Sequence, residues 1–399
     1  MLKTENIIIG AGLAGLACAK ILHDSKRDYI LIEKENEVGG RVKSLLMGDY
    51  IFDVGFQVYN TNYRSASKIL DLDRLDLKYF KPGAYIYSNN KFNRISDPMR
   101  DFSDIKNALL FKDATLLDKI KTLWLKVKLY GDPNRFFDDD DMTTYQYLTN
   151  FGFSDNYIKK FFKPFFGGIF LERELETSSN FFKFVFSNLS YGNVSIPLKG
   201  MGEIPNQIFK SLNPGSTFLG TEVKNIENKI VSTNSGLNIQ SKNIVIANDS
   251  QFDIEYNSVN CFYFSTSNDI VGDGYIHLFP GNSIINNIVN LTAISKRYSP
   301  EDKNLLSITM IDDLSPDVDI INILKNELSN IYHIDKNKFR YEKSFSIPKA
   351  QVTQKKNYFK NRESKDDDFI YAGDYLTNSS IDGAIKSGLD AARQILSGK

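Results

Sequence analysis

A short apolar run followed at once by a glycine-rich turn constrains this chain most. Residues 7–9 are all isoleucine and predict a buried strand, residues 10–15 read Gly-Ala-Gly-Leu-Ala-Gly, and a helical pattern follows over residues 16–22. A second apolar run ends at Glu33, eighteen positions after Gly15. This order is typical of a βαβ unit that binds a dinucleotide. The first glycine permits the tight turn, the second lets the backbone approach a pyrophosphate, and the third lets the helix sit close to the strand.

The N-terminus of that helix would face the phosphates, and Glu33 would accept hydrogen bonds from the adenosine ribose. Two alternatives compete with this interpretation. A secretory signal peptide would need an uninterrupted apolar core, but Glu5 precedes the core and three glycines break it. A strand and turn without a ligand would leave Glu33 without a role. The dinucleotide interpretation accounts for all of these residues.

Composition limits the classes of partner. The 399 residues suffice for two domains, and the 49 basic and 49 acidic residues balance, so nothing favours a nucleic acid. Cys18 and Cys261 form neither a CxxC pair nor a metal cluster, so we expect no metal and a reducing cytoplasmic setting. The longest uncharged apolar run, residues 7–19, is short of the roughly 20 residues that span a bilayer. We therefore expect no integral membrane segment.

Three further segments, together with the first, indicate a family resemblance. Gly39-Gly40-Arg41 follows the βαβ unit, residues 197–205 read Pro-Leu-Lys-Gly-Met-Gly-Glu-Ile-Pro, and residues 372–374 read Ala-Gly-Asp, with residues 380–388 reading Ser-Ile-Asp-Gly-Ala-Ile-Lys-Ser-Gly. In this order and over nearly the whole length, the chain resembles the superfamily of FAD-dependent amine oxidases, phytoene desaturases and protoporphyrinogen oxidases. A nicotinamide dehydrogenase would lack the Gly-Gly-Arg step and the distant Gly-Asp motif.

The resemblance implies a fold and a cofactor. The fold is α/β, with a Rossmann-like FAD-binding domain of the GR2-type flavoprotein fold and a substrate domain of a sheet plus a helical cap. Residues 1–80, 195–255 and 360–399 would form the FAD-binding domain, and residues 81–194 and 256–359 the substrate domain. The FAD would be bound non-covalently, because neither Cys nor His follows His333.

The resemblance also implies which residues bind FAD. Arg41 would lie near the pyrophosphate, the hairpin at Val223 would edge the adenine, Asp374 would hold the ribityl chain, and the helix near Asp382 would point N–H groups at the flavin. The full set of expected cofactor residues is Gly10, Gly12, Leu13, Ala14, Gly15, Glu33, Lys34, Gly39, Gly40, Arg41, Val223, Gly373, Asp374, Ile381, Asp382 and Ala384.

The substrate is expected to be small and apolar. Amine oxidases often carry an aromatic residue where this chain has Ile381, and residues 372–384 look more like the carotene desaturases. The family chemistry would pass a hydride from a lipophilic substrate, such as an isoprenoid, to flavin N5, with a quinone or oxygen as electron acceptor. Alternatives are an amine oxidase that yields an imine and hydrogen peroxide, a non-redox flavin isomerase or mutase, and a flavin redox sensor.

Residue-level candidates for catalysis are few. Lys296 and Lys349 could hold a water at flavin N5, as in some amine oxidases, and the catalytic residue otherwise stays unknown. Phenylalanines crowd residues 151–186, and Phe165, Phe166 and Ile381 are expected in the substrate pocket. The alternative is a packed core with no ligand role.

Residues 112–130 form a further candidate, because they interleave lysines with leucines and Trp124. We expect a helix of the substrate domain with a solvated lysine face. The alternative is a basic amphipathic helix in peripheral contact with an anionic membrane.

Overall fold

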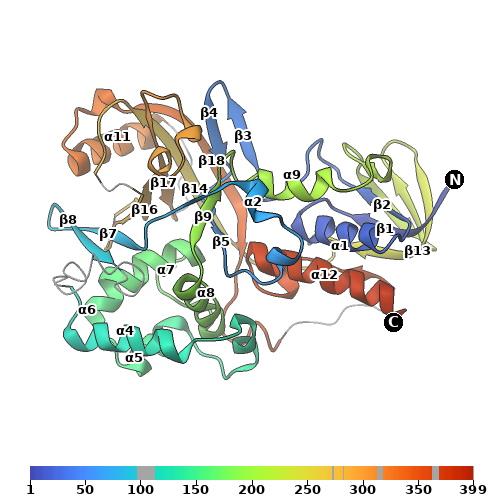
Figure 1. The fold of residues 1–399 in the computed structure, drawn as a ribbon, viewed down its shortest axis with the longest axis horizontal. Coiled ribbons are helices and arrows are strands. Elements are labelled where there is room, and N and C mark those ends of the chain that lie inside the picture. Colours follow the sequence, from blue (N-terminus) through green and yellow to red (C-terminus); the bar gives the residue numbers. More distant parts are fainter. Residues whose placement is uncertain (97–112, 272–273, 282, 312–317, 362–367, 399) are drawn as a thin grey trace.

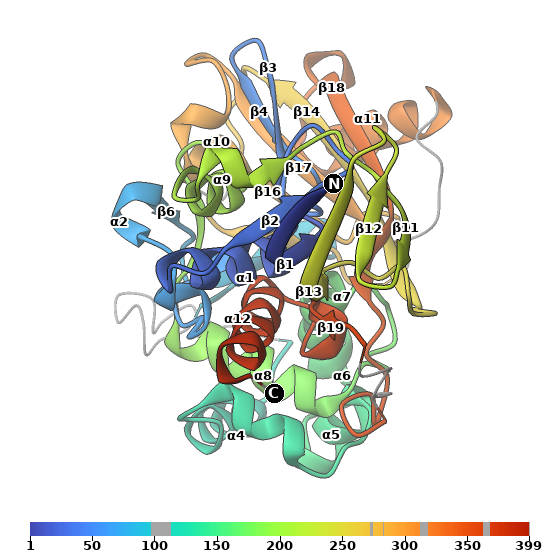
Figure 2. The ribbon, with the colours of Figure 1, turned by 90° about the vertical axis from the view of Figure 1, so that its right-hand side faces the viewer.

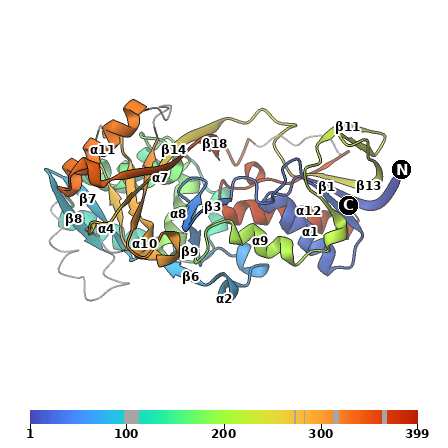
Figure 3. The same ribbon diagram turned by 90° about the horizontal axis from the view of Figure 1, so that it is seen from above.

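The computed structural model describes residues 1–96, 113–271, 274–281, 283–311, 318–361 and 368–398. This described part holds two large sheets and a group of helices (Figure 1). Seen from above, the sheet that contains the first strand lies at one end of an elongated molecule and the second sheet at the other (Figure 3).

The first sheet is built around β1 (Leu2–Ile9), whose last four residues are buried. It pairs in parallel with β2 (Tyr29–Ile32) on one side and β13 (Asn238–Ile246) on the other. Two short parallel strands extend it, β10 (Thr217–Phe218) beside β2 and β19 (Ile370–Tyr371) beside β13. An antiparallel meander, β11 (Val223–Glu227) and β12 (Ile230–Thr233), completes the sheet on β13. Strands from distant parts of the sequence thus meet in one nucleotide-binding type of sheet.

Two helices pack side by side against this sheet, α1 (Leu13–Asp24) and α12 (Ile381–Ser397), as Figure 2 shows. Their backbones nearly touch at Gly388, where an added Cβ would lie 2.0 Å from the carbonyl oxygen of Ala14. Only glycine permits this approach. The helix α9 (Glu203–Lys210) packs against α1 as well.

The second sheet joins strands from the middle of the chain. Its strands run in the order β18 (Arg340–Val352), β14 (Tyr256–Thr266), β17 (Asn304–Met310), β16 (Asn287–Asn290), β15 (Ile276–Leu278), β7 (Gly83–Ser88) and β8 (Lys91–Ser96). Neighbours are antiparallel except β15 and β7. The helix α11 (Val318–Tyr332) buries Leu324, Leu328 and Ile331 in an apolar cluster with residues of this sheet. A short helix, α10 (Leu291–Ile294), follows β16.

Small elements connect the two sheets. They are α2 (Leu72–Leu75), the hairpin β3 (Ser44–Met47) with β4 (Tyr50–Asp53), and a three-stranded sheet of β5 (Tyr59–Asn60), β9 (Val194–Pro197) and β6 (Leu77–Tyr79). Asp53 ends β4 and is buried, and it accepts hydrogen bonds from Ser44 Oγ (2.5 Å), the Met201 N–H (2.8 Å) and the Tyr298 hydroxyl (2.8 Å). Burial raises the pKa of Asp53, and these hydrogen bonds act in the opposite direction. The carboxylate ties β4 to segments far along the chain.

The other described helices form a layer below the second sheet in Figure 1. They are α4 (Leu116–Lys128), α5 (Thr144–Phe151), α6 (Asp155–Tyr157), α7 (Lys163–Phe170) and α8 (Ser179–Tyr191). Their phenylalanines interlock; the rings of Phe166 and Phe182, for example, lie 4.7 Å apart between centroids. Within the described residues, no helix is long and apolar enough to cross a membrane.

The structure corrects one expectation here. We expected α4 to expose a lysine face, but its exposed side chains are mainly apolar, while Lys126 is buried. Residue 112, where that candidate segment starts, lies outside the described residues. The division into two domains stays a prediction, although the strands of each large sheet come from the expected parts of the sequence.

Candidate active site

A large cavity connects the first sheet to the helical layer. Its volume is about 1710 Å³, and its walls include the glycine-rich turn, the start of α12, residues from the strands of the second sheet and the phenylalanine-rich helices. Pockets for one small ligand are typically about 300–1,000 Å³. The cavity therefore has room for a large cofactor together with a substrate.

The glycine-rich turn forms one end of the cavity. A Cβ added at Gly12 would meet nothing within 4 Å, so any side chain there would extend into the cavity. Gly15 is not in the cavity wall; its Cβ would lie 1.9 Å from the carbonyl oxygen of Gly10, which holds the start of α1 against the turn. The two glycines thus have different roles, one in leaving space and one in close packing.

Glu33 lies at the end of β2 beside this turn and is nearly buried. Its Oε2 accepts the Ala11 N–H at 2.7 Å, and its Oε1 accepts the Glu35 N–H at 3.0 Å. Each carboxylate oxygen can accept more than one hydrogen bond, so capacity remains on the cavity side. The residue both shapes the turn and fits the expected contact with a ribose.

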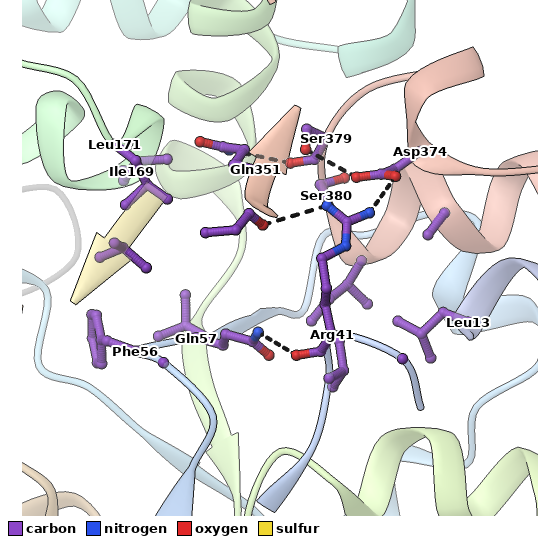
Figure 4. A pocket seen from close by; sticks show the side chains of 18 of the residues that line it. Leu13, Arg41, Phe56, Gln57, Ile169, Leu171, Gln351, Asp374, Ser379 and Ser380 are labelled. Carbon is purple, nitrogen blue, oxygen red and sulfur yellow. Dashed lines mark hydrogen bonds and ion pairs between the residues drawn. The ribbon is translucent and has the colours of Figure 1, made fainter. Parts of the chain in front are cut away.

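Arg41 and Asp374 form an ion pair in the cavity wall (Figure 4). Arg41 Nη2 lies 2.5 Å from Asp374 Oδ1, and Ser379 Oγ donates to Asp374 Oδ2 at 2.9 Å. Gln57 Nε2 donates to the Arg41 carbonyl oxygen at 2.9 Å. The ion pair between Arg41 and Asp374 joins the Gly-Gly-Arg segment to the C-terminal Gly-Asp motif, 333 positions further along the chain.

Two glutamine oxygens beside this ion pair have no hydrogen-bond partner among the described residues. Gln57 Oε1 and Gln351 Oε1 are buried and make no hydrogen bond to described residues, and both glutamines line the cavity (Figure 4). A buried acceptor without a partner is costly, so these oxygens fit a ligand that carries N–H or O–H groups. Sequence reasoning missed both glutamines, since neither stands in a motif.

The start of α12 also faces the cavity. Ile381 and Ala384 line it, and the N-cap residue Ser380 accepts the Gly383 N–H at 2.9 Å. Asp382 is a correction, because it is not in the cavity wall. Its Oδ1 accepts the N–H groups of Ser65 and Ala66 at 2.7 and 2.9 Å. Burial raises the pKa of Asp382, and these hydrogen bonds oppose the shift.

Aromatic side chains form the opposite end of the cavity. Both expected residues, Phe165 and Phe166, line it, together with Phe161, Phe181, Phe184 and Phe186. Phe162 and Phe182 lie behind them and are fully buried outside the cavity wall. The phenylalanine cluster is therefore a packed core whose inner side is also a pocket wall.

The two lysine candidates for catalysis lie in different places. Lys349 borders the cavity, but its Nζ is paired with Asp249 Oδ2 at 2.9 Å. Lys296 is exposed, precedes the buried Tyr298 and is not in the cavity wall. The structure therefore contradicts Lys296 as a catalytic candidate.

The described residues suit FAD, since a glycine cradle with open space, a helix N-terminus and buried acceptors line one cavity. The sequence model for the family described as flavin-containing amine oxidoreductase matches residues 13–251 and 252–396. The chain belongs to this family. Its cofactor is FAD, and its reaction class is that of a flavin-dependent oxidoreductase.

Individual relatives of this flavin-containing oxidoreductase are distant. Bovine amine oxidase [flavin-containing] B is 42% identical over 43 residues, which cover 11% of this chain and 8% of the bovine enzyme. The chain thus matches less than a tenth of the length of this curated relative. A structure of putrescine oxidase bound to putrescine is 14% identical with a TM-score of 0.73, and 99% of each chain is covered. Reduced UDP-galactopyranose mutase is 13% identical with a TM-score of 0.70, covering 99% of this chain and 96% of the mutase. These structures show the fold alone.

The structure thus brings most of the expected cofactor residues to one cavity. Those in its wall are Gly10, Gly12, Leu13, Ala14, Glu33, Lys34, Gly39, Gly40, Arg41, Val223, Gly373, Asp374, Ile381 and Ala384. Their individual contacts with FAD remain predictions.

Proposed function

We propose that this flavin-containing oxidoreductase removes a hydride from a lipophilic substrate, such as an isoprenoid, in a desaturase-like reaction. The aromatic end of the cavity carries this proposal. Its phenylalanine rings offer apolar contact, and burying apolar substrate against them is favourable by about 25 cal/mol per Å².

The charges in the cavity wall support the same choice over an amine. Among the described residues, its carboxylates are Glu33, Glu35, Glu222, Asp249 and Asp374. All five lie on the elements around the first sheet, and Asp249 and Asp374 are paired with Lys349 and Arg41. The described residues of the helical end contribute Lys119 and Lys126 instead. Among the described residues, lysines therefore border the rings, whereas the carboxylates lie toward the first sheet.

The side chains at the centre of the cavity would position the reactants. Bound FAD supplies the hydride acceptor. The start of α12 presents its positive end to the cavity, and such a helix end stabilises negative charge placed there. Arg41 is held by Asp374, and Gln57 and Gln351 offer acceptors for ligand donors. The phenylalanine rings would exclude water from the reacting carbon. We propose a quinone or oxygen as the electron acceptor.

The test follows flavin absorbance without oxygen. A cell lipid extract in detergent and a pool of primary amines and polyamines are added separately to the purified protein. Bleaching by the lipid fraction alone is expected. Bleaching by amines alone would replace this proposal by amine oxidation, and no bleaching by either would favour a non-redox mutase, an isomerase or a redox sensor.

A matched pair of variants tests whether the aromatic end holds the substrate. Phe165 lines the cavity, whereas Phe359 is similarly half-buried against the same cluster but lies outside the wall. Phe165→Ala should raise the half-saturating lipid concentration while the flavin content stays unchanged. Phe359→Ala should leave that concentration unchanged. Equal effects of both would show that the variants act through stability and not through substrate contact.

A further inference from the structure

The helix α4 exposes an apolar stripe at the edge of the cavity. Leu116, Leu117, Ile120, Trp124 and Val127 each expose between 53% and 67% of their surface, and Leu123 exposes 41%. At about 100° per residue, these six side chains fall within an arc of about 120° on an ideal helix. We call these six residues the α4 apolar face. Monomeric soluble proteins rarely leave such contiguous apolar surface in water.

The rest of α4 fixes this orientation. Leu125 is fully buried, and Asp118 is buried in a capping box with Thr115. Asp118 also accepts hydrogen bonds from the Ser154 N–H and hydroxyl at 2.8 and 2.7 Å. The helix therefore cannot rotate to bury its apolar face without breaking these contacts.

Lysines border the α4 apolar face. On the same ideal helix, Lys121 and the exposed Lys128 fall beyond one edge of the arc. Lys119 and Lys126 fall beyond the other edge, where both line the cavity and Lys126 is buried. Lys121 Nζ donates to the Gly152 carbonyl oxygen, which anchors its ammonium beside the helix. The one carboxylate of α4, Asp118, is buried. This is the charge pattern of a helix that lies in the surface of an anionic bilayer.

The α4 apolar face also reaches the substrate cavity. Leu123 belongs to the face and lines the cavity, and Lys119, Thr122 and Lys126 line it beside Leu123. Leu123 thus links the exposed apolar face to the lining of the cavity that also contains the phenylalanine rings. This continuity favours a lipid surface over a protein partner as the occupant. A second copy of the chain would place lysines against lysines.

We propose that α4 docks on an anionic lipid bilayer, with the α4 apolar face at the boundary of headgroups and acyl chains and the cavity opening beside it. The docking is inferred from the exposed helix itself. Its purpose, the supply of a lipophilic substrate, rests on the proposed function.

Trp124 makes the test direct, because it is the single tryptophan of the chain and lies in the α4 apolar face. The full-length protein is mixed with vesicles of phosphatidylglycerol and phosphatidylcholine. We expect a blue shift of tryptophan emission, quenching by lipids brominated on the acyl chains, and co-sedimentation. Vesicles of phosphatidylcholine alone should bind at least about tenfold more weakly, since each lysine near an anionic surface contributes to binding. An unshifted and unquenched emission would overturn the proposal.

A variant pair locates the contact. Ile120→Asp places a charge in the α4 apolar face and keeps Trp124, and it should weaken binding to anionic vesicles by at least about tenfold. Leu46→Asp is the control, because Leu46 is 69% exposed on the distant β3–β4 hairpin. It should bind as the wild type does. An equal loss in Leu46→Asp would contradict docking through α4, as would a dimer in lipid-free buffer that Ile120→Asp converts to monomer.

The docking proposal and the proposed function have separate tests, so one can be contradicted without the other. Flavin bleaching in detergent needs no vesicle, and tryptophan quenching needs no turnover. Bleaching by lipid without quenching would overturn the docking and leave the proposed function. Quenching without bleaching would uphold the docking and contradict the proposed function.

Discussion

Two glycines in the turn before α1 lead to opposite predictions. Gly12 has φ near −70° and ψ near 178°, which any residue can adopt, and the space around its Cβ position is open. Gly12→Val should therefore fold. Replacing a glycine N-cap costs a few tenths of a kcal/mol and up to about 1, and the reduced freedom of the unfolded chain offsets about 0.4–1 kcal/mol. We expect the free energy of unfolding of the apoprotein to change by less than about 1 kcal/mol.

The same valine should weaken FAD binding. Its methyl groups would occupy cavity space beside the turn, where the cofactor backbone is expected. Crowding of this kind costs about 1–3 kcal/mol, which raises the dissociation constant by a factor of about 5 to 150. Gly15→Ala should instead destabilise the fold, because its Cβ must move from 1.9 Å to the 3.4 Å at which ordinary contact with Gly10 begins.

The assays are urea unfolding of the apoproteins and FAD titration followed by flavin fluorescence. Gly12→Val should unfold like the wild type and bind FAD more weakly, and Gly15→Ala should unfold at lower urea. A wild-type dissociation constant in Gly12→Val would refute the placement of FAD at this turn. Unchanged stability in Gly15→Ala would refute the close packing of α1 against it.

Three further outcomes are expected. Tyr298→Phe should lower the free energy of unfolding by about 1–3 kcal/mol in urea titrations, because it leaves the buried Asp53 carboxylate short of a donor. Burial raises the pKa of Asp53 in the folded protein above its unfolded value of 3.8. Asp53 therefore contributes its full stabilisation below pH 3.8, and this stabilisation is lost as the pH rises through the folded pKa. As the pH falls from about 7 to about 4.5, the free energy of unfolding should therefore rise more in the wild type than in Asp53→Asn. Parallel curves of unfolding free energy against pH for the two proteins would contradict this. Lys349→Met should keep the anaerobic bleaching rate within about fivefold of wild type in stopped-flow traces, because its exposed ammonium is paired with Asp249, and a larger loss would make it a catalytic group.

Local patterns predicted the parts of the site that are local in the sequence. The strand, turn and helix around Gly12 follow from glycine spacing and apolar runs, and Glu33 follows from its position after them. The four motifs of the resemblance then brought Arg41 and Asp374 into one site, which their separation in sequence alone could not do. The structure places these two side chains in contact.

Contacts between distant, unpatterned residues could not be predicted. The backbone amides that bind the Asp382 carboxylate lie more than 300 positions away, so no local pattern shows this contact. The sequence shows only that Asp382 lies at a helix start, which suggested a cofactor role. For α4, the helical period identified an apolar stripe but not the side on which other elements pack. Gln57 and Gln351 belong to no sequence pattern, and only the structure shows that their buried oxygens accept no hydrogen bond from the part of the chain that it describes.

The close crossing of α1 and α12 has a consequence for biosynthesis. Ala14 is translated long before Gly388, which packs against it, and β19 joins β13 equally late. A ribosome-bound chain therefore cannot complete the wall of the nucleotide site until α12 has emerged. FAD capture should come after translation of this helix, and the cofactor would then bridge the earliest and latest parts of the fold.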